Sequence, residues 1–436
     1  MSPDRVPNPH MYEVGLYYQN IWTDVSDLPN GNLGVYNENF FSDLSNYRLC
    51  WELLDDGSPI GTGTVEYLQA APQQKISVPV NMDFPAIPGE LLLNVRYELK
   101  HSHGLLPAGH VAAKQQFILN DFYFPDITLE YDPAQAASAP EFREVDAEHF
   151  AVAGDGFQVL FSYLNGYIQS YSVGGMEFIE PGTALTPNFW RAPTDNDYGA
   201  GLQNKYSAWR NPLILLRPGE IVRTLDAGVA KVECNYDLAD FATLRLSYQI
   251  DAQGRIKVTQ TMTPIDRKKA PDMFRFGLRM TMPEEFSEVA YYGRGPIENY
   301  PDRNHYTDIG IYGQSVREQS YSYIRPQENG LRTDIRWWNM LDGYGKGLRI
   351  TAQEPFCVSA LNYTIESLDE GPAKANSHTT EIDPVSTVSV CIDKMHMGVG
   401  GVQSWGAVPR QEYMIPFAPY TFVFLLSPVT NYTTYR

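Results

Sequence analysis

Residues 291–341 read YYGRGPIENYPDRNHYTDIGIYGQSVREQSYSYIRPQENGLRTDIRWWNML, and this stretch decides how the rest of the chain is interpreted. Turn-forming residues are interleaved in it with aromatic rings and with arginine and carboxylate side chains. Such a composition is typical of neither a regular helix nor a plain strand. We therefore predict ordered loops that are held in place by ion pairs and stacked aromatic rings.

Hairpin signals precede this stretch. Residues 157–164 and 167–173 flank the pair Asn165 and Gly166, a combination that strongly favours a two-residue hairpin turn. Residues 243–250 and 255–262 flank a second turn, and their apolar side chains alternate as in a half-buried strand. We expect no amphipathic helix longer than about two turns. Residues 144–436 are therefore predicted to form one large antiparallel β structure.

The first part of the chain shows the same alternation in shorter blocks. Residues 47–54, 76–80 and 90–99 are apolar blocks separated by Pro-, Gly- and Asp-rich turns. About seven short strands in about 110 residues predict an immunoglobulin-like β-sandwich over residues 1–119. Residues 120–143 contain three prolines and a run of small residues, which suits an extended linker. The predicted fold class is all-β.

Composition excludes several kinds of partner. The chain has 436 residues, enough for two or three domains, and its formal net charge is −19. This charge argues against nucleic acid and against an anionic membrane surface, because both require clustered Lys and Arg. We see no apolar run long enough to span a membrane and no export signal in MSPDRVPNPH. Four cysteines without metal-binding spacing are expected to be buried thiols.

Three motifs carry a resemblance to a known family. They are YGRGPIENYPDR with PQENGLRTDIRWW (residues 292–303 and 326–338), FWRAPTDND (189–197) and HMGVGGVQSW (396–405). Together they resemble the last domain of the glycoside hydrolase family 2 β-galactosidases. DRVPNPHMYEV (4–14) resembles the seam where that family's catalytic barrel ends. The resemblance implies a C-terminal region without the barrel, formed by an immunoglobulin-like domain and a supersandwich similar to galactose mutarotases.

Trp405 is the strongest candidate for contact with a ligand. It follows Gly398, Gly400 and Gly401, and a large aromatic at the end of a glycine-rich turn is easily placed at a surface. There its flat face would stack on the C–H face of a sugar. The alternative is a tryptophan that packs the loop onto the core. The resemblance implies the first reading, with Trp405 as a substrate platform facing the barrel.

A second candidate is the irregular segment 175–197. The resemblance implies that its first half borders the active-site mouth, whereas the alternative is a purely structural loop. The residues placed at this border are Gly175, Glu180, Pro181, Gly182, Thr186 and Pro187. In the second half, Arg191 is expected to form an internal ion-pair clamp with Asp195 and Asp197.

The carboxylates of the 291–341 stretch are interpreted as structural. Arg294, Glu298, Asp302 and Arg303 are expected to form ion pairs, and neighbouring arginines lower the pKa of a carboxyl group. A lowered pKa makes a poor general acid. We therefore expect no catalytic residue here. The resemblance implies that the catalytic glutamates, the magnesium and the sodium belong to the barrel, so no cofactor is expected in this chain.

Two short patterns resemble metal sites, but neither is predicted to bind a metal. Residues 195–197 offer carboxylate and amide oxygens to a hard cation, but the spacing falls short of a calcium loop. His101, His103 and His110 form an HxH…H pattern that would suit a transition metal, but solvated histidines on an exposed hairpin are the preferred interpretation.

The expected role is the non-catalytic part of a β-galactosidase, with a β-galactoside or galactose, the catalytic barrel and further copies of the enzyme as partners. One alternative is an autonomous mutarotase-like epimerase that uses His305 with Glu298 or Glu318. The other is a carbohydrate-binding module whose exposed aromatics are Trp405, Trp209 or Trp22. A bacterial cytoplasmic or periplasmic location, the preferred galactoside and the oligomeric state are left open.

Overall fold

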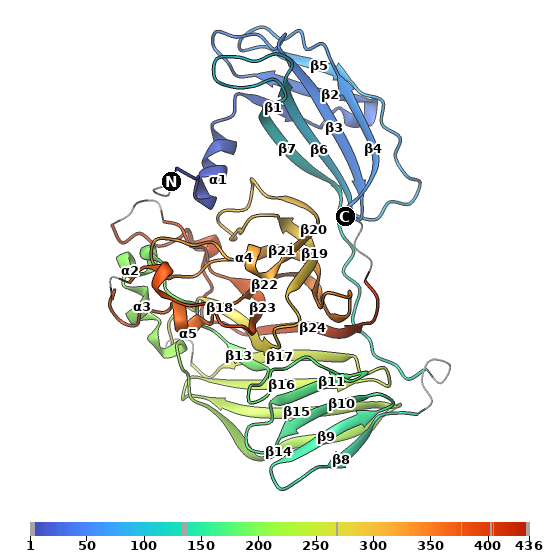
Figure 1. Ribbon diagram of the computed structural model, residues 1–436, viewed down its shortest axis with the longest axis vertical. Coiled ribbons are helices and arrows are strands. Elements are labelled where there is room, and N and C mark those ends of the chain that lie inside the picture. Colours follow the sequence, from blue (N-terminus) through green and yellow to red (C-terminus); the bar gives the residue numbers. More distant parts are fainter. Residues whose placement is uncertain are drawn as a thin grey trace. The chain divides into compact units, whose positions relative to one another are not determined.

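The computed structural model describes residues 5–132, 138–266, 269–375, 377–401, 403 and 405–432. The chain divides into two compact units (Figure 1). The first contains the residues up to Tyr123 together with Asn304–Ile311, and the second contains Phe124–Arg303 and the residues from Tyr312 onward. The sequence places a linker at 120–143, and the division at 123 lies within that range. The inclusion of Asn304–Ile311 in the first unit has no signal in the sequence.

The first unit is built from two antiparallel sheets. The three-stranded sheet has the order β1 (Ile21–Asp24), β2 (Asn32–Asn37), β5 (Lys75–Pro79). The four-stranded sheet has the order β4 (Ser58–Val65), β3 (Tyr47–Asp55), β6 (Leu91–Leu99), β7 (Val111–Asn120). Leu33 of β2 and Leu93 of β6 lie in one buried core, as strand alternation requires. The predicted two-sheet sandwich is confirmed.

Helix α1 (Pro9–Tyr17) and the 3₁₀ turn η1 (Leu28–Asn30) complete the first unit. With nine residues, α1 exceeds two turns, but it is not the amphipathic helix that the prediction concerned. Pro9 occupies its first turn, where a missing N–H costs nothing. Pro9 is also its one buried residue, so α1 has no apolar stripe by which the sequence could reveal it.

The second unit contains a five-stranded and a twelve-stranded sheet (Figure 1). The smaller sheet has the order β12 (Met176–Glu177), β11 (Ile168–Val173), β10 (Phe157–Ser162), β9 (His149–Gly154), β8 (Glu141–Glu144). The main path of the larger sheet is β13 (Thr186–Asn188), β18 (Arg275–Met282), β23 (Val388–His396), β22 (Gly347–Leu361), β24 (Tyr420–Val429), β17 (Ile256–Pro264), β16 (Ala242–Ile250), β15 (Val229–Leu238), β14 (Ile214–Asp226). Beside this path, β19 (Glu288–Gly295) pairs with β20 (Asp308–Ser315) and with β21 (Arg332–Leu341), which also pairs with β22.

Helices in the second unit are short. They are α2 (Asp195–Ala200), α3 (Leu202–Lys205), α4 (Val316–Gln319) and α5 (Ile365–Leu368), with the 3₁₀ turns η2 (Ser207–Trp209), η3 (Thr379–Glu381) and η4 (Gln411–Tyr413). None exceeds two turns. The strands therefore carry the core, and the predicted all-β class is confirmed.

The two sheets of the second unit face each other across one core. Leu244, Leu246 and Tyr248 of β16 are buried, as their alternation predicts, and Tyr248 packs edge-on against Phe161 of β10 with ring centroids 5.4 Å apart. The predicted turn at Gly166 has φ +68°, and a Cβ there would lie 2.6 Å from the sulfur of a buried cysteine. Glycine is therefore required at this turn for both its conformation and its size.

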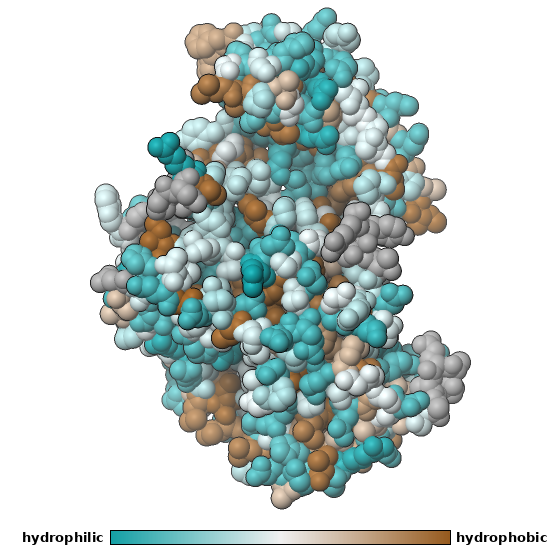
Figure 2. Space-filling view, in the orientation of Figure 1, coloured by the Kyte–Doolittle hydropathy of each residue, from teal (hydrophilic) through white to brown (hydrophobic). Residues whose placement is uncertain are grey.

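Surface chemistry agrees with the composition. On the visible face of each unit hydrophilic residues predominate, with apolar residues scattered singly or in small groups (Figure 2). The four cysteines are free and buried, as expected. Within the described ranges, no helix has the length and apolar character needed to cross a membrane.

Candidate functional site

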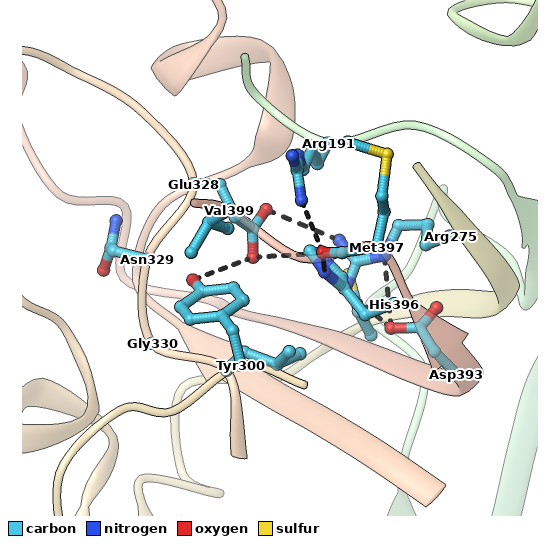
Figure 3. Close-up of polar contacts among 12 residues, drawn as sticks. Arg191, Arg275, Tyr300, Glu328, Asn329, Gly330, Asp393, His396, Met397 and Val399 are labelled. Atoms are coloured by element: carbon cyan, nitrogen blue, oxygen red, sulfur yellow. Dashed lines mark hydrogen bonds and ion pairs between the residues drawn. The ribbon is translucent and has the colours of Figure 1, made fainter. Parts of the chain in front are cut away.

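The three motifs of the sequence meet around residues 397–400 in the second unit. The FWRAPTDND segment runs from β13 into α2, YPDR follows β19, PQENG precedes β21, and HMGVGG begins at the last residue of β23. A first link joins two of them directly, because the backbone N–H of Glu328 donates to the carbonyl of Ala192 at 3.1 Å. Figure 3 shows how the remaining links converge.

Arg191 is the most heavily bonded residue of this region. Its Nη1 donates to the carbonyl of Met397 at 2.8 Å, and its Nη2 donates to that of Gly398 at 3.0 Å. The other side of the guanidinium binds Asp197 through two hydrogen bonds of 2.8 and 3.1 Å. The guanidinium also lies over the ring of Phe274, 4.6 Å from its centroid. A rigid planar fork of donors suits this task, whereas a lysine would not.

Asp197 has a second role in the same segment. With Thr194 it forms a capping box that starts α2, because each side chain accepts from the other residue's backbone N–H. The expected pairing of Arg191 with Asp195 is not the one the structure has. Asp195, the first residue of α2, is exposed and forms ion pairs with Lys374 at 2.6 Å and Arg325 at 3.4 Å.

Asp302 binds the backbone on the other side of residues 397–400. Its two carboxylate oxygens accept from the N–H groups of Val399 at 3.1 Å and Gly400 at 2.7 Å. Within the described part of the chain these amides, rather than an arginine, are its partners, which differs from the expected ion pair. These two charge-assisted hydrogen bonds stabilise the negative charge of the Asp302 carboxylate.

Arg294, Glu298 and Arg303 form ion pairs, as expected. Arg303 donates to Glu298 at 2.6 Å, and Glu298 also accepts from the backbone of Gly330 at 2.7 Å. Arg294 pairs with Asp334. Glu298 is therefore a buried connector between the YPDR turn and the PQENG segment.

Beneath the loop lies a buried cluster of charges (Figure 3). Arg275 donates to Asp393 at 2.6 Å and lies 3.7 Å from Glu328. His396 lies 3.6 Å from Glu328 through Nε2, and its Nδ1 contacts the carbonyl of Met397 at 2.8 Å. The hydroxyl of Tyr300 reaches Glu328 at 3.5 Å. The sequence reasoning missed the grouping of Arg275, Asp393 and His396, although Glu328 and His396 each stand in one of the motifs.

Burial and neighbouring charges set the ionisation of this cluster. Burial opposes the charge of Glu328, but Arg275 and His396 outweigh it, so the pKa of Glu328 is lowered. Burial lowers the pKa of His396 despite the nearby carboxylate. At neutral pH the cluster therefore contains a charged Glu328 and a neutral His396. The cluster therefore acts as a structural support for the loop above it.

Space also argues against turnover at this cluster. The hollow that Glu328 and Arg275 line has a volume of about 20 Å³. That volume holds about one water molecule and excludes a sugar ring. Among the described residues, the hollow beside Glu328 and Arg275 therefore leaves no room for a sugar.

Trp405 stands in contrast to its support. Its side chain is 91% exposed, and its backbone N–H donates to the side chain of Gln403. The next residue, Gly406, has φ +95°, and a Cβ there would lie 3.3 Å from the carbonyl of Gly199 at α2. An exposed indole therefore extends from a loop whose base is fixed.

The segment expected to border the active site lies in two places. Gly175 has a positive φ in the turn before β12, and Pro181 and Gly182 line a surface hollow of about 340 Å³. Thr186 and Pro187 line a different hollow of about 260 Å³. Glu180 is tied by its backbone to Thr281 at 2.8 Å. In the described ranges no hydrogen bond or ion pair joins this segment to residues 397–405.

Residues of the two alternative functions are not brought together. His305 is exposed and lies 3.3 Å from Glu13, and the side chain of Glu318 is engaged in capping α4. Trp209 is 0% exposed, which corrects its assignment as a surface aromatic: it packs against the rings of Phe189, Phe241 and Phe417 inside the core. Trp22 is half-buried and donates to Glu38 at 2.6 Å.

In the described part of the chain, neither of the two metal-site patterns gathers its side chains into a group that could hold a metal ion. His101 and His103 are exposed at the β6–β7 hairpin and His110 is half-buried. Across the described ranges, no group of three or more His, Cys, Asp or Glu side chains could hold a metal ion.

Fold and site define an all-β protein that presents one exposed indole on a loop with a buried ionic base. Two family models match this chain: "Beta galactosidase small chain" over residues 153–426 and "Beta-galactosidase, domain 4" over residues 33–120. The chain belongs to the β-galactosidase small-chain family. The resemblance indicated by the motifs is confirmed.

Curated relatives are longer than this chain. A β-galactosidase of Priestia megaterium is 28% identical over 436 residues, with 98% of this chain and 40% of the relative covered. One from Lactobacillus delbrueckii subsp. bulgaricus is 30% identical, with 94% and 39% covered. The chain thus spans about 40% of the length of these relatives. Among solved structures, a galactose mutarotase related enzyme of Lactobacillus acidophilus has a TM-score of 0.35 at 10% identity, covering 67% of this chain and 98% of its own.

Proposed function

We propose that this chain is the non-catalytic C-terminal part of a glycoside hydrolase family 2 β-galactosidase. The complete enzyme hydrolyses terminal non-reducing β-D-galactose residues of β-D-galactosides with retention of configuration. In it, Trp405 completes the substrate pocket of a catalytic barrel that other residues of the enzyme form. The family match supports the enzyme class.

The observation that carries the proposal is the exposure of Trp405 on a fixed base. An indole that is 91% exposed leaves a large apolar surface in water. Side chains from the other motifs meanwhile hold the base of its loop. A flat aromatic surface on a pre-organised support is what recognition of a sugar's apolar face requires. A loop that served only to cover the core would bury the ring instead.

The non-catalytic role rests on the state of the carboxylates. A retaining glycosidase needs two carboxyl groups about 5–5.5 Å apart beside an open substrate position. Glu298, Glu328 and Asp197 are each buried against an arginine, and Asp302 is committed to two amides. The lowered pKa of Glu328 also leaves it deprotonated at neutral pH, so it cannot act as an acid there.

Further parts of the proposal follow from the same reasoning. The partners are a β-galactoside or galactose, the catalytic barrel, and further copies in a homo-oligomer. The chain itself holds no cofactor, since the magnesium and sodium of the family belong to the barrel. Its net charge of −19 disfavours nucleic acid and anionic membranes. We place it in the bacterial cytoplasm or periplasm.

Complementation tests this function. A separately expressed barrel-containing part would be mixed with this chain, and hydrolysis of an aryl β-D-galactoside would be followed. Trp405→Ala should raise KM strongly and Trp405→Phe less, because a ring face is retained. Tyr344→Ala is the matched control, since Tyr344 is 87% exposed at the β21–β22 turn and should leave KM unchanged. Equal kinetics for Trp405→Ala and Tyr344→Ala would refute the role of Trp405.

A carbohydrate-binding module is a second candidate, because the exposure of Trp405 would also serve binding by this chain alone. Galactose would then change the intrinsic fluorescence of the isolated chain, and Trp405→Ala would abolish the change. Saturable binding with no complementation of the barrel would favour this second function.

A further inference from the structure

The glycines of the 397–401 loop need an explanation that their backbone conformation does not give. Gly398 and Gly400 do not have positive φ values, so another residue could adopt their conformations. Their constraint is one of space. A Cβ on Gly398 would lie 2.5 Å from a carboxylate oxygen of Asp302, and a Cβ on Gly400 would lie 3.0 Å from it. The close approach of one carboxylate therefore leaves no room for a Cβ at Gly398 unless the carboxylate shifts, and makes a Cβ at Gly400 a tight contact.

Resting on the proposed function, we propose that Asp302 is a positioning residue: its carboxylate fixes the loop that holds Trp405 and so sets the affinity for the sugar. The same oxygens that exclude a Cβ accept the N–H groups of Val399 and Gly400. Glycine is thus required because only glycine lets the carboxylate reach the backbone. Asp302 itself does not touch the sugar.

The loop base is held from two directions. Arg191 donates to the carbonyls of Met397 and Gly398, and Asp302 accepts from the next two amides. The side chain of Asn196 donates to the carbonyl of Val399 at 2.9 Å. Backbone groups of four successive residues are therefore bound to side chains of opposite charge or polarity. Sliding the loop along its own axis would break all of these hydrogen bonds together.

The carboxylate of Asp302 is itself pre-organised. It stands in a turn closed by two backbone hydrogen bonds between Tyr300 and Arg303, of 2.7 and 3.2 Å. Arg303 in turn is held by the buried Glu298, which also binds the backbone of Gly330. The position of Asp302 is therefore set by the core of the second unit. Two charge-assisted hydrogen bonds from Val399 and Gly400 to the fixed carboxylate of Asp302 in turn fix the position of the loop.

Among the described residues, few contacts hold the tip of the loop. Trp405 is almost fully exposed and its backbone is tethered within the loop itself, by Gln403. Loss of the hydrogen bonds at Val399 and Gly400 should consequently let the indole sample more positions. A platform that is ordered only on binding costs affinity but leaves the chemistry of the bound substrate unchanged. A higher KM with an unaltered kcat is the expected kinetic result.

The first test uses the isolated chain with Asp302→Asn. This change keeps the shape of the side chain but replaces one of its two acceptor oxygens with an NH2 group, which cannot accept a backbone N–H. Hydrogen exchange should become faster at Val399 and Gly400, and quenching of Trp405 fluorescence by acrylamide should change. Trp405→Phe identifies the Trp405 signal. Glu318→Gln is the control, because Glu318 also accepts hydrogen bonds from a loop residue, Ser315, at a distant helix cap. Unchanged exchange in Asp302→Asn would overturn the inference.

A double-mutant cycle gives a second, independent test. Gly398→Ala should disturb the loop because its methyl meets the carboxylate, and it should disturb it much less in an Asp302→Ala background. Gly400→Ala should show the same dependence with a smaller effect. If the cost of Gly398→Ala is the same with and without Asp302, the spatial argument is wrong. Circular dichroism and thermal melts would verify that each variant is folded.

Kinetics of the enzyme complemented with this chain distinguish the positioning role of Asp302 from the substrate-binding role of Trp405. Asp302→Asn should raise KM by about tenfold, the size expected for losing hydrogen bonds to a charged group, with kcat retained. If Trp405→Ala raises KM and Asp302→Asn does not, the positioning role is refuted. If neither changes KM while exchange at Val399 increases, the proposed function fails and the structural effect of Asp302 stands.

Discussion

Removing the guanidinium of Arg191 should strongly destabilise the second unit. Arg191→Met keeps most of the side-chain volume but deletes two hydrogen bonds to Asp197 and those to the carbonyls of Met397 and Gly398. Asp197 then remains as a buried carboxylate without its cation. Breaking a buried pair in this way costs about 3–5 kcal/mol.

The size of the effect can be expressed as a melting temperature. The second unit contains about 300 residues, and an unfolding entropy of about 2 cal/mol/K per residue gives ~0.6 kcal/mol per degree. Arg191→Met should therefore lower the Tm of that unit by about 5–8 °C. Differential scanning calorimetry with urea titration as a second probe would measure it. Arg217→Met is the matched control, because the Arg217–Asp237 pair is exposed and worth ~0–1 kcal/mol.

The double variant Arg191→Met/Asp197→Asn sharpens the test. It leaves no buried charge unpaired, so it should recover part of the loss. A Tm change in Arg191→Met as small as in Arg217→Met would refute the reasoning. So would a double variant that is less stable than the sum of its single changes, because the lone carboxylate could not then be the source of the cost.

Further predictions concern titration and packing. The pKa of His396 is lowered from 6.5, so the unfolded chain binds more protons than the folded chain just below pH 6.5. The free energy of unfolding therefore falls as pH drops through that range. His396→Gln should make this fall less steep. The pKa of His149 is raised by Asp146, so its contribution is present below pH 6.5 and lost as pH rises through its folded pKa; His149→Gln should flatten that loss instead. Urea titrations at pH 5 to 8 would compare both, and slopes that change in the same direction would contradict the assignment. Gly166→Ala, which combines φ +68° with a Cβ 2.6 Å from the sulfur of Cys234, should cost roughly 1–3 kcal/mol in the same assay, whereas Gly343→Ala, where no atom lies within 4 Å, should cost much less.

The strands could be predicted because their signal is local. Leu244, Leu246 and Tyr248 alternate with partly exposed or small residues, and burial of one face of a strand leaves that trace in any sequence. Helix α1 leaves no such trace because its residues are mostly exposed. The inclusion of residues 304–311 in the first unit depends on contacts between distant parts of the chain, which no local pattern encodes.

The site shows the same limit. Charges clustered in sequence indicated ion pairs, and Arg303 does bind Glu298 five residues away. Composition could not decide between Asp195 and Asp197 as the partner of Arg191, because that choice depends on which way the first turn of α2 faces. The contacts of Arg275 with Asp393 and of Asp302 with Gly400 join residues about 100 positions apart. The first of these contacts follows from the pairing of β18 with β23, which is a property of the whole sheet.

The most direct test of the account is hydrolysis of an aryl β-D-galactoside by the purified chain, measured alone at high protein concentration with magnesium and again after addition of the separately expressed barrel. The account predicts no hydrolysis by the chain alone and activity on mixing. Hydrolysis by the chain alone that survives repurification and scales with its concentration would contradict it, and would direct attention to Glu298, Glu318 and Glu328 as the residues among which to seek a catalytic pair.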